Sequence, residues 1–379
     1  MKIEQNRWTQ AKGWEPQTPG RLGLSADLVL LFGSTAIFKE KVSIATLQKS
    51  YPKALLLGCS TAGEICGTQV TDEAMVATAI DFEATQIKGA CVNIADVENS
   101  YQAGQRLAEA LDKKDLVHVF VLSDGLKVNG SELVRGLTRH LPPEVIVTGG
   151  LSGDGARFQE TLVMCGAAAV PGTLAALGLY GDHLKIGYGS LGGWDPFGPD
   201  RLVTKATANV LHELDGKPAL DLYKQYLGDH AKGLPATGLL FPLSIRIKEG
   251  EPGVVRTILS VSEKDRSMTF AGDVPVGSYA RLMKANCERL IDGAAGAAKA
   301  CYEEIGTSSP DLAILISCIG RKLVLKQRVE EELESVRDVL GQHAVLTGFY
   351  SYGEISPLTH NAKCQLHNQT MTITTFSES

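Results

Sequence analysis

The chain has 379 residues, of which 44% are hydrophobic and 21% charged, which is an ordinary globular composition with room for two domains. Its formal net charge is −6, and no run of Lys and Arg exceeds two residues, so we expect neither DNA nor RNA as a partner. The N-terminus has no signal-peptide pattern, and the eight cysteines include no Cys-x-x-Cys, which together predict a cytoplasmic protein with reduced thiols and no metal site.

Three segments of the chain share one pattern in sequence order. Each begins with Asp, continues as a short apolar run typical of a strand buried on both faces, and ends at Ser. The three runs are residues 27–34, 115–123 and 311–317. The helices predicted after them are 38–50, 130–140 and 327–341, and further strands are predicted at 74–82, 161–170 and 366–376.

The uncharged residues 161–181 are numerous enough to suggest a membrane span. They are rich in Ala and Gly and contain Pro171-Gly172, which favours two buried strands joined by a turn. We therefore expect no membrane association.

A glycine-rich turn follows the second strand of each unit, at residues 58–65, 149–155 and 348–355. The first and third turns share the sequence Gly-x-x-x-x-Gly-Glu-Ile, which begins at Gly58 and at Gly348. The glycines are best explained by the positive φ angles of tight turns. Glu64 and Glu354 hold matching places after these strands, and two interpretations stay open: ligand contacts, or hydrogen bonds to the turn backbone.

These units predict an α/β fold with large mixed sheets, built from related strand–helix–strand–turn–strand units in two related halves. We place a domain boundary within 215–232 and assign residues 1–215 and 216–379 to two domains. Between the units we expect a loop at 189–199, a turn at 215–218, a helix at 219–227 and a long helix at 278–305.

No catalytic signature is present. The chain contains no Gly-x-Ser-x-Gly, no phosphate-binding Gly-x-x-x-x-Gly-Lys and no His-Glu-x-x-His, so we expect a binding protein without catalytic residues. The aromatic residues near Trp194 and in the third turn are candidates to line a pocket, with a packed linker as the alternative for the Trp194 segment. A single histidine in this sequence is more simply explained as a structural residue than as a ligand.

The ordered motifs give a resemblance to the FIST family of sensory proteins. It rests on the two Gly-x-x-x-x-Gly-Glu-Ile turns and on the segment Gly192-Gly193-Trp194-Asp195-Pro196-Phe197-Gly198-Pro199. It also rests on Ser317-Cys318-Ile319-Gly320-Arg321 and on Leu366-His367-Asn368-Gln369-Thr370. The resemblance spans nearly the whole chain and implies a ligand-binding input module in bacterial signalling.

The Leu-His-Asn-Gln-Thr ending is similar to that of the NosP subgroup of nitric-oxide-sensing FIST proteins. This resemblance implies haem b, held without a covalent attachment site, and control of a partner histidine kinase or cyclic-di-GMP enzyme. The haem iron would be bound through His367, with His360 and His183 as further candidates.

Other FIST proteins are thought to bind small metabolites such as amino acids, and this is the alternative function. The residues that would then contact the ligand are Ser60, Glu64, Trp194, Arg321, Tyr352, Glu354 and Asn368. A homo-oligomer is compatible with either function.

Overall fold

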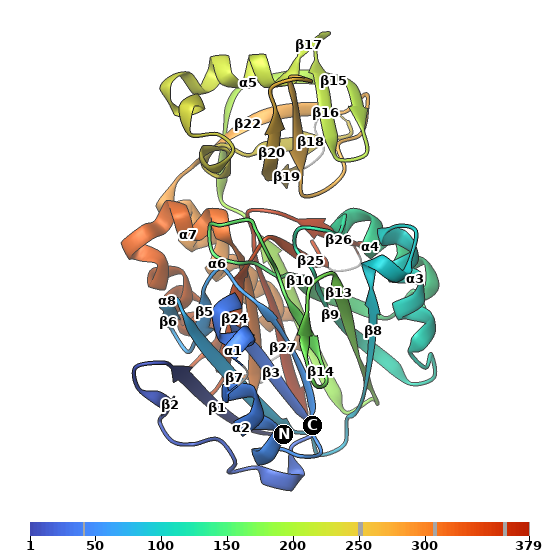
Figure 1. Ribbon diagram of the computed structural model, residues 1–379, viewed down its shortest axis with the longest axis vertical. Coiled ribbons are helices and arrows are strands. Elements are labelled where there is room, and N and C mark those ends of the chain that lie inside the picture. Colours follow the sequence, from blue (N-terminus) through green and yellow to red (C-terminus); the bar gives the residue numbers. More distant parts are fainter. Residues whose placement is uncertain (41, 249–252, 306–308, 359–361, 379) are drawn as a thin grey trace.

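The computed structural model describes residues 1–379 except 41, 249–252, 306–308, 359–361 and 379. Figure 1 shows a large body, which holds both termini, and a small domain at one end of it. Three sheets with their helices make up the body, and a fourth sheet with helix α5 (Ala219–Leu227) makes up the small domain. Within the described residues, no helix is long and apolar enough to cross a membrane.

The three sheets of the body follow one plan. Their strand orders are β12–β11–β4–β3–β7–β1–β2, β26–β25–β10–β9–β13–β8 and β14–β27–β23–β24–β5–β6. The first sheet contains Ala169–Val170, Val163–Cys165, Leu55–Ser60, Leu28–Gly33, Ala74–Asp81, Lys2–Thr9 and Gly13–Glu15. The second contains Cys364–His367, Gly353–Pro357, Ile146–Leu151, Leu116–Ser123, Thr173–Tyr180 and Gln86–Asn93. The third contains Leu184–Leu191, Met371–Glu378, Leu312–Cys318, Val345–Ser351, Glu64–Cys66 and Gln69–Thr71.

At the centre of each sheet lies a parallel pair of strands from one unit: β3 with β4, β9 with β10, and β23 with β24. The strand that follows each turn joins another sheet. Strand β5 of the first unit pairs with β24, β25 of the third pairs with β10, and β11 of the second pairs with β4, all antiparallel. The units therefore exchange strands in a cycle.

The inner faces of the three sheets meet along a common apolar axis. Leu30, Phe120 and Ile314 hold equivalent positions in the three parallel pairs and belong to one buried cluster. A gap on the axis, lined only by apolar side chains, has space of about 10 Å³, which is roughly room for one water molecule. The axis is a packed core without a ligand-sized chamber.

Helices cover the outer faces of the sheets. They are α1 (Thr35–Glu40), α2 (Val42–Ser50), α3 (Ser100–Ala110), α4 (Gly130–His140), α6 (Cys287–Ile305), α7 (Ile319–Leu325) and α8 (Val329–Leu340). Short 3₁₀ turns lie at Gly23–Ser25, Ile94–Asp96, Gly228–Gly233, Ala236–Leu240 and Lys326–Arg328. The predicted mixed α/β fold with large sheets is confirmed, and the related units of the described chain number three, one for each sheet.

The small domain occupies the stretch between β14 and α6. Its sheet has the order β19–β18–β22–β15–β16–β21–β20, and β17 pairs with β16. These strands are Val254–Arg256, Leu243–Arg246, Tyr279–Ala285, Trp194–Thr207, Val210–Leu214, Ser267–Phe270, Ile258–Ser262 and Lys217–Pro218. The boundary expected at 215/216 falls inside this domain, between β16 and β17. The small domain therefore contains residues from both sides of the expected boundary.

Two predicted elements of the small domain are wrong. The expected loop at 189–199 instead holds the end of strand β14 and the start of strand β15, where register shifts between Phe197 and Arg201 accommodate the prolines. The expected helix at 278–305 begins as strand β22, which pairs with both β15 and β18, and becomes helical only at Cys287.

Glycines allow close approach inside each parallel pair. A Cβ atom at Gly149 or Gly348 would lie 1.8 Å from a carbonyl oxygen of the neighbouring strand, and one at Gly58 would lie 2.1 Å away. Gly149 and Gly348 also have φ angles of +150° and +155°. Positive φ therefore explains Gly149 and Gly348 only in part. All three positions also lack space for a side chain.

We predict that Gly348→Ala lowers the free energy of unfolding by about 3 kcal/mol or more, because both the backbone clash and the φ angle oppose a methyl group. Gly67→Ala is the matched control, since Gly67 has a φ of +61° but no atom within 4 Å of the added Cβ, and we expect it to cost about 1 kcal/mol. Urea unfolding measures both values. Equal losses would contradict a clash at Gly348.

Candidate functional site

Glu64 and Glu354 make the same contacts in the first and third turns. Each carboxyl accepts a hydroxyl hydrogen bond at 2.5 Å and a backbone N–H hydrogen bond at 3.2 Å. The donors are Thr61 and Ala74 for Glu64, and Ser351 and Thr370 for Glu354. Both side chains are at most 1% exposed, so these contacts favour the structural interpretation over ligand binding.

Burial is the largest influence on both carboxyls and raises the pKa of each to about 8. Glu64 and Glu354 are therefore mostly protonated at pH 7 and poorly suited to supply a negative charge to a ligand. A protonated carboxyl keeps acceptor capacity, so it can still accept from the hydroxyl and from the backbone N–H.

Ser60 and Tyr352 are also occupied by structural bonds. The Ser60 hydroxyl accepts a hydrogen bond from the backbone N–H of Leu162 at 2.8 Å. The Tyr352 hydroxyl donates to the Asp154 carboxylate and lies 2.9 Å from the Gly155 carbonyl oxygen. Both residues are buried and hold the three turns together.

Arg321 is the largest fully buried side chain in the described structure and is not available to a ligand. Its guanidinium pairs with Glu332 at 2.8 Å and donates to the carbonyls of Gly192 and Leu290 at 2.6 Å each. Glu332 also accepts from Tyr350 at 2.5 Å, so the pair is satisfied within the core.

Trp194 and Asn368 connect the body to the small domain. The Trp194 indole donates to the Gln369 carbonyl at 2.9 Å, and the Gln369 amide donates to the Leu239 carbonyl at 3.0 Å. The Asn368 side-chain oxygen accepts from the backbone N–H of Thr257 at 3.3 Å. The Leu-His-Asn-Gln-Thr segment therefore lies at the interface between the two parts of the molecule.

The structure describes two of the three histidines expected to bind haem, His367 and His183. His367 is 3% exposed, its Nε2 lies 2.9 Å from the Ser356 carbonyl oxygen, and burial lowers its pKa to about 4. His183 is exposed beside Asp182, and His360 lies outside the described residues. In the described part of the chain, no group of three or more His, Cys, Asp or Glu side chains could hold a metal ion.

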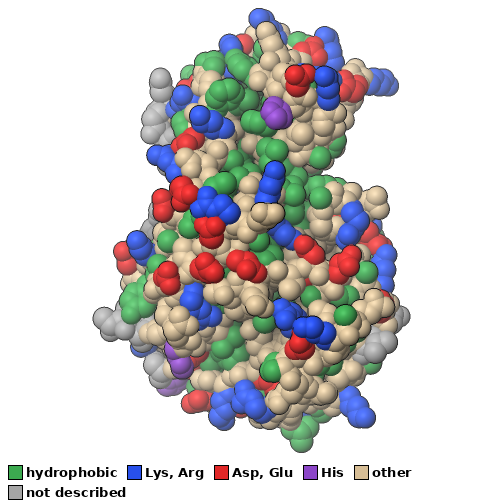
Figure 2. Space-filling view, turned by 90° about the vertical axis from the view of Figure 1, so that its left-hand side faces the viewer, with side chains coloured by type: hydrophobic (Ala, Val, Ile, Leu, Met, Phe, Trp, Pro, Cys, Tyr) green, Lys and Arg blue, Asp and Glu red, His purple; other side chains and the backbone are tan. Residues whose placement is uncertain are grey.

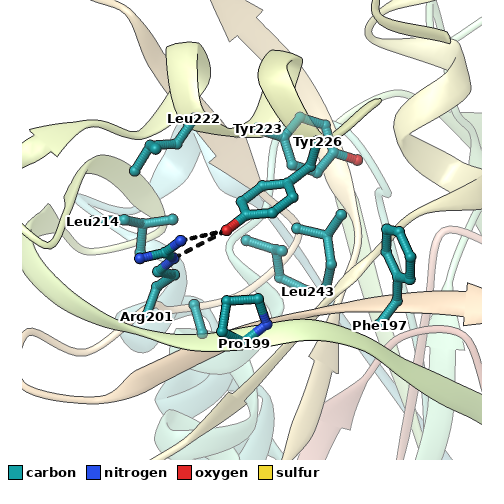
Figure 3. A pocket seen from close by; sticks show the side chains of 10 residues that line it. Phe197, Pro199, Arg201, Leu214, Leu222, Tyr223, Tyr226 and Leu243 are labelled. Carbon is teal, nitrogen blue, oxygen red and sulfur yellow. Dashed lines mark hydrogen bonds between the residues drawn. The ribbon is translucent and has the colours of Figure 1, made fainter. Parts of the chain in front are cut away.

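A cavity in the small domain lies between helix α5 and strand β15; we call it the α5 cavity. Its inner part is apolar and narrow, with space of about 10 Å³. Figure 3 shows Tyr226 reaching from α5 across this part, with its hydroxyl toward Arg201. The lining residues are Phe197, Pro199, Arg201, Leu214, Leu222, Tyr223, Tyr226, Leu243, Ala280 and Leu282.

The outer part of the α5 cavity is polar and has a volume of about 420 Å³, within the usual range for small-ligand sites. Arg201 pairs with Asp215 at 3.0 Å and donates to the Tyr226 hydroxyl, contacts that raise the pKa of its guanidinium, with Tyr226 contributing most. Lys217 also lines this part, and its side-chain ammonium makes no hydrogen bond or ion pair with the described residues. Two cations, one carboxylate and the Gln225 amide thus surround one open space.

The sequence did not identify the α5 cavity. The Asp215–Pro218 turn and the helix at 219–227 were both predicted, but Arg201 and Tyr226 stand in no motif and meet only through the fold.

The buried glutamates generate a pH prediction. A carboxyl with a pKa near 4.5 when unfolded and about 8 when folded stabilises the protein fully below pH 4.5, and this stabilisation is lost as pH rises toward 8. Glu354→Gln mimics the neutral acid, so we expect the variant to lose less stability than the parent between pH 5 and 8. Chemical unfolding across that range measures the slopes, and identical slopes would contradict a neutral Glu354.

Solved structures similar to this chain share 9% sequence identity with it. A cyanuric acid hydrolase from A. caulinodans has a TM-score of 0.37, and a chorismatase has 0.34; each comparison covers 99% of this chain and 98% of the other. At these TM-scores neither structure informs the function of this chain.

Curated relatives include an uncharacterized protein of Methanocaldococcus jannaschii, 26% identical over 86% of this chain and 65% of that protein's length. An uncharacterized protein of Mycobacterium tuberculosis is 24% identical over 92% of this chain and 91% of its own length. The FIST N domain matches residues 27–217, and the FIST C domain matches residues 219–357. The chain therefore belongs to the FIST family of signal-transduction sensor domains.

Proposed function

We propose that this FIST chain binds a small zwitterionic metabolite, an amino acid or a close analogue, in the α5 cavity and reports it to a partner protein. The observation that supports this most directly is the placing of Lys217 and Arg201 beside Asp215 around about 420 Å³. The two cations suit a carboxylate, and Asp215 suits an ammonium group. The role proposed is binding, without conversion of the ligand.

Lys217 is the residue that gives the cavity its capacity for an anion. The Arg201 guanidinium already has Asp215 and Tyr226 as partners, whereas the Lys217 ammonium has none among the described residues. A ligand carboxylate would gain a charge-assisted hydrogen bond there without displacing a protein partner.

The fold offers a direct connection from the cavity to the body. Helix α5 carries Tyr226 and leads through two 3₁₀ turns to Leu239, whose carbonyl accepts the hydrogen bond from Gln369. Ligand contacts that shift α5 would therefore act on the interface with the body. The partner implied by the family resemblance is a histidine kinase or a cyclic-di-GMP enzyme.

We expect at least one of the standard amino acids to raise the melting temperature, because a ligand that binds the native state stabilises it. Lys217→Ala should weaken binding of that ligand by about 10-fold or more, since it removes a charge-assisted contact. Lys205→Ala is the matched control: Lys205 lies on β15, is 64% exposed and does not line the cavity. Isothermal titration calorimetry measures the affinities, and equal affinity in both variants would contradict this site.

A haem sensor remains the prediction drawn from the resemblance, and the histidines described above do not favour it. We expect His367→Ala to lower stability, because the contact with Ser356 is lost, and to leave the spectrum of added haemin unchanged. Absorption spectra of both proteins with haemin, oxidised, reduced and with nitric oxide, check this. A Soret band present only in the parent protein would instead support haem binding through His367.

A further inference from the structure

Two cysteines from different sheets lie where the first and second sheets of the body meet, a junction that we call the seam. Cys91 is in β8, an edge strand of the second sheet, and Cys165 ends β11 in the first sheet. The two strands contact each other although they belong to separate sheets. All eight cysteines are described, and Cys91 is the one whose side chain is exposed, while Cys165 is half-buried.

Strand geometry directs both side chains into this seam. Gly89 and Cys91 lie on one face of β8, because alternate residues of a strand share a face. A Cβ at Gly89 would lie 2.8 Å from a methyl carbon of Leu55 in β4, so this face of β8 lies against the first sheet. Cys165 pairs with Leu57, which shares a strand face with Leu55.

The surroundings of Cys165 agree with this placement. Its Sγ lies 3.9 Å from the carbonyl oxygen of Ala90, the residue before Cys91. The pKa of Cys165 is raised to about 12, mainly by burial and further by the charge and hydrogen bonding of the Cys91 thiol. The two thiols are therefore direct neighbours, one open to solvent and one shielded.

We propose that Cys91 and Cys165 form a peroxide-reactive dithiol that closes to a disulfide between the first and second sheets. The exposed thiol reacts first with a solute oxidant, and the shielded thiol completes the bond. This modification site is separate from the α5 cavity and does not depend on the proposed ligand.

The reaction consumes one hydrogen peroxide. Cys91 loses its proton and its sulfur attacks one peroxide oxygen; the O–O bond breaks, and the departing hydroxide takes up a proton to become water. Cys165 then loses its proton and its sulfur attacks the Cys91 sulfur; the S–O bond breaks, and the second hydroxide leaves as water. Two thiols are oxidised to one disulfide, and the peroxide is reduced to two waters.

The test is peroxide treatment of the full-length folded protein, followed by trypsin digestion without reductant and mass spectrometry. We expect peptides 89–106 and 158–185 to appear as one linked species that dithiothreitol separates. Denatured thiol counts should fall from eight to six. The oxidised protein should melt about 5 °C or more higher, because the bond closes a long loop in the unfolded chain.

Cys91→Ser is the decisive variant, since an exposed side chain is replaced and folding should be unaffected. It should lose the linked peptide and the reductant-sensitive rise in melting temperature. Cys287→Ser, at a half-buried cysteine elsewhere, should retain both. Oxidation of Cys91 to sulfinic or sulfonic acid with Cys165 left free, or a linked peptide that persists in Cys91→Ser, would overturn the proposal.

Discussion

The antiparallel pairing of each post-turn strand with another sheet is the constraint on which the body depends. Because β5, β11 and β25 each pair with a sheet other than that of their own unit, the three turns are drawn together at one end of the axis. Backbone bonds then join them: Ala62 donates to Tyr350, Gly153 to Ser60, and Tyr352 to Leu151, at 2.8–3.1 Å. No turn can move without disturbing the other two.

This convergence explains why residues that resemble a ligand site are structural. The turn ends carry polar side chains that the exchange buries, and a buried polar group must find a partner. Glu64 and Glu354 meet this need as neutral acids, and Arg321 meets it by pairing with Glu332. The open polar space lies instead in the small domain, where Lys217 remains without a partner in the described structure.

The surface view agrees with a structural role for the turns of the body and the proposed binding role for the small domain. Figure 2 shows the molecule narrowing between the small domain and the body, with acidic and basic side chains interspersed on the face in view. The narrow region is crossed by the bonds of Gln369 and Asn368 described above. These bonds are well placed to pass a change in the small domain to the body.

The sequence predicted those strands and helices that are determined by local residue patterns. The three buried strands match β3, β9 and β23, and the helices predicted at 130–140 and 219–227 match α4 and α5. The sequence could not predict which sheets β5 and β25 join, because pairing between distant residues leaves no local signal. Strand β15 was not predicted because its prolines are typical of a loop. The α5 cavity was not predicted because Arg201 and Tyr226 come together only in the folded chain.

The cyclic exchange also sets the order in which this protein can be completed during synthesis. Ile65 pairs with Gly348, so the third sheet needs a strand from near the start of the chain and partners from near its end. At roughly 5–20 residues per second, the segment Glu64–Cys66 waits on the order of 15–60 s for the ribosome to deliver that partner. Contacts this distant in sequence make for slow folding, and β5 emerges as an unpaired edge that must be kept from other chains until the C-terminal unit arrives.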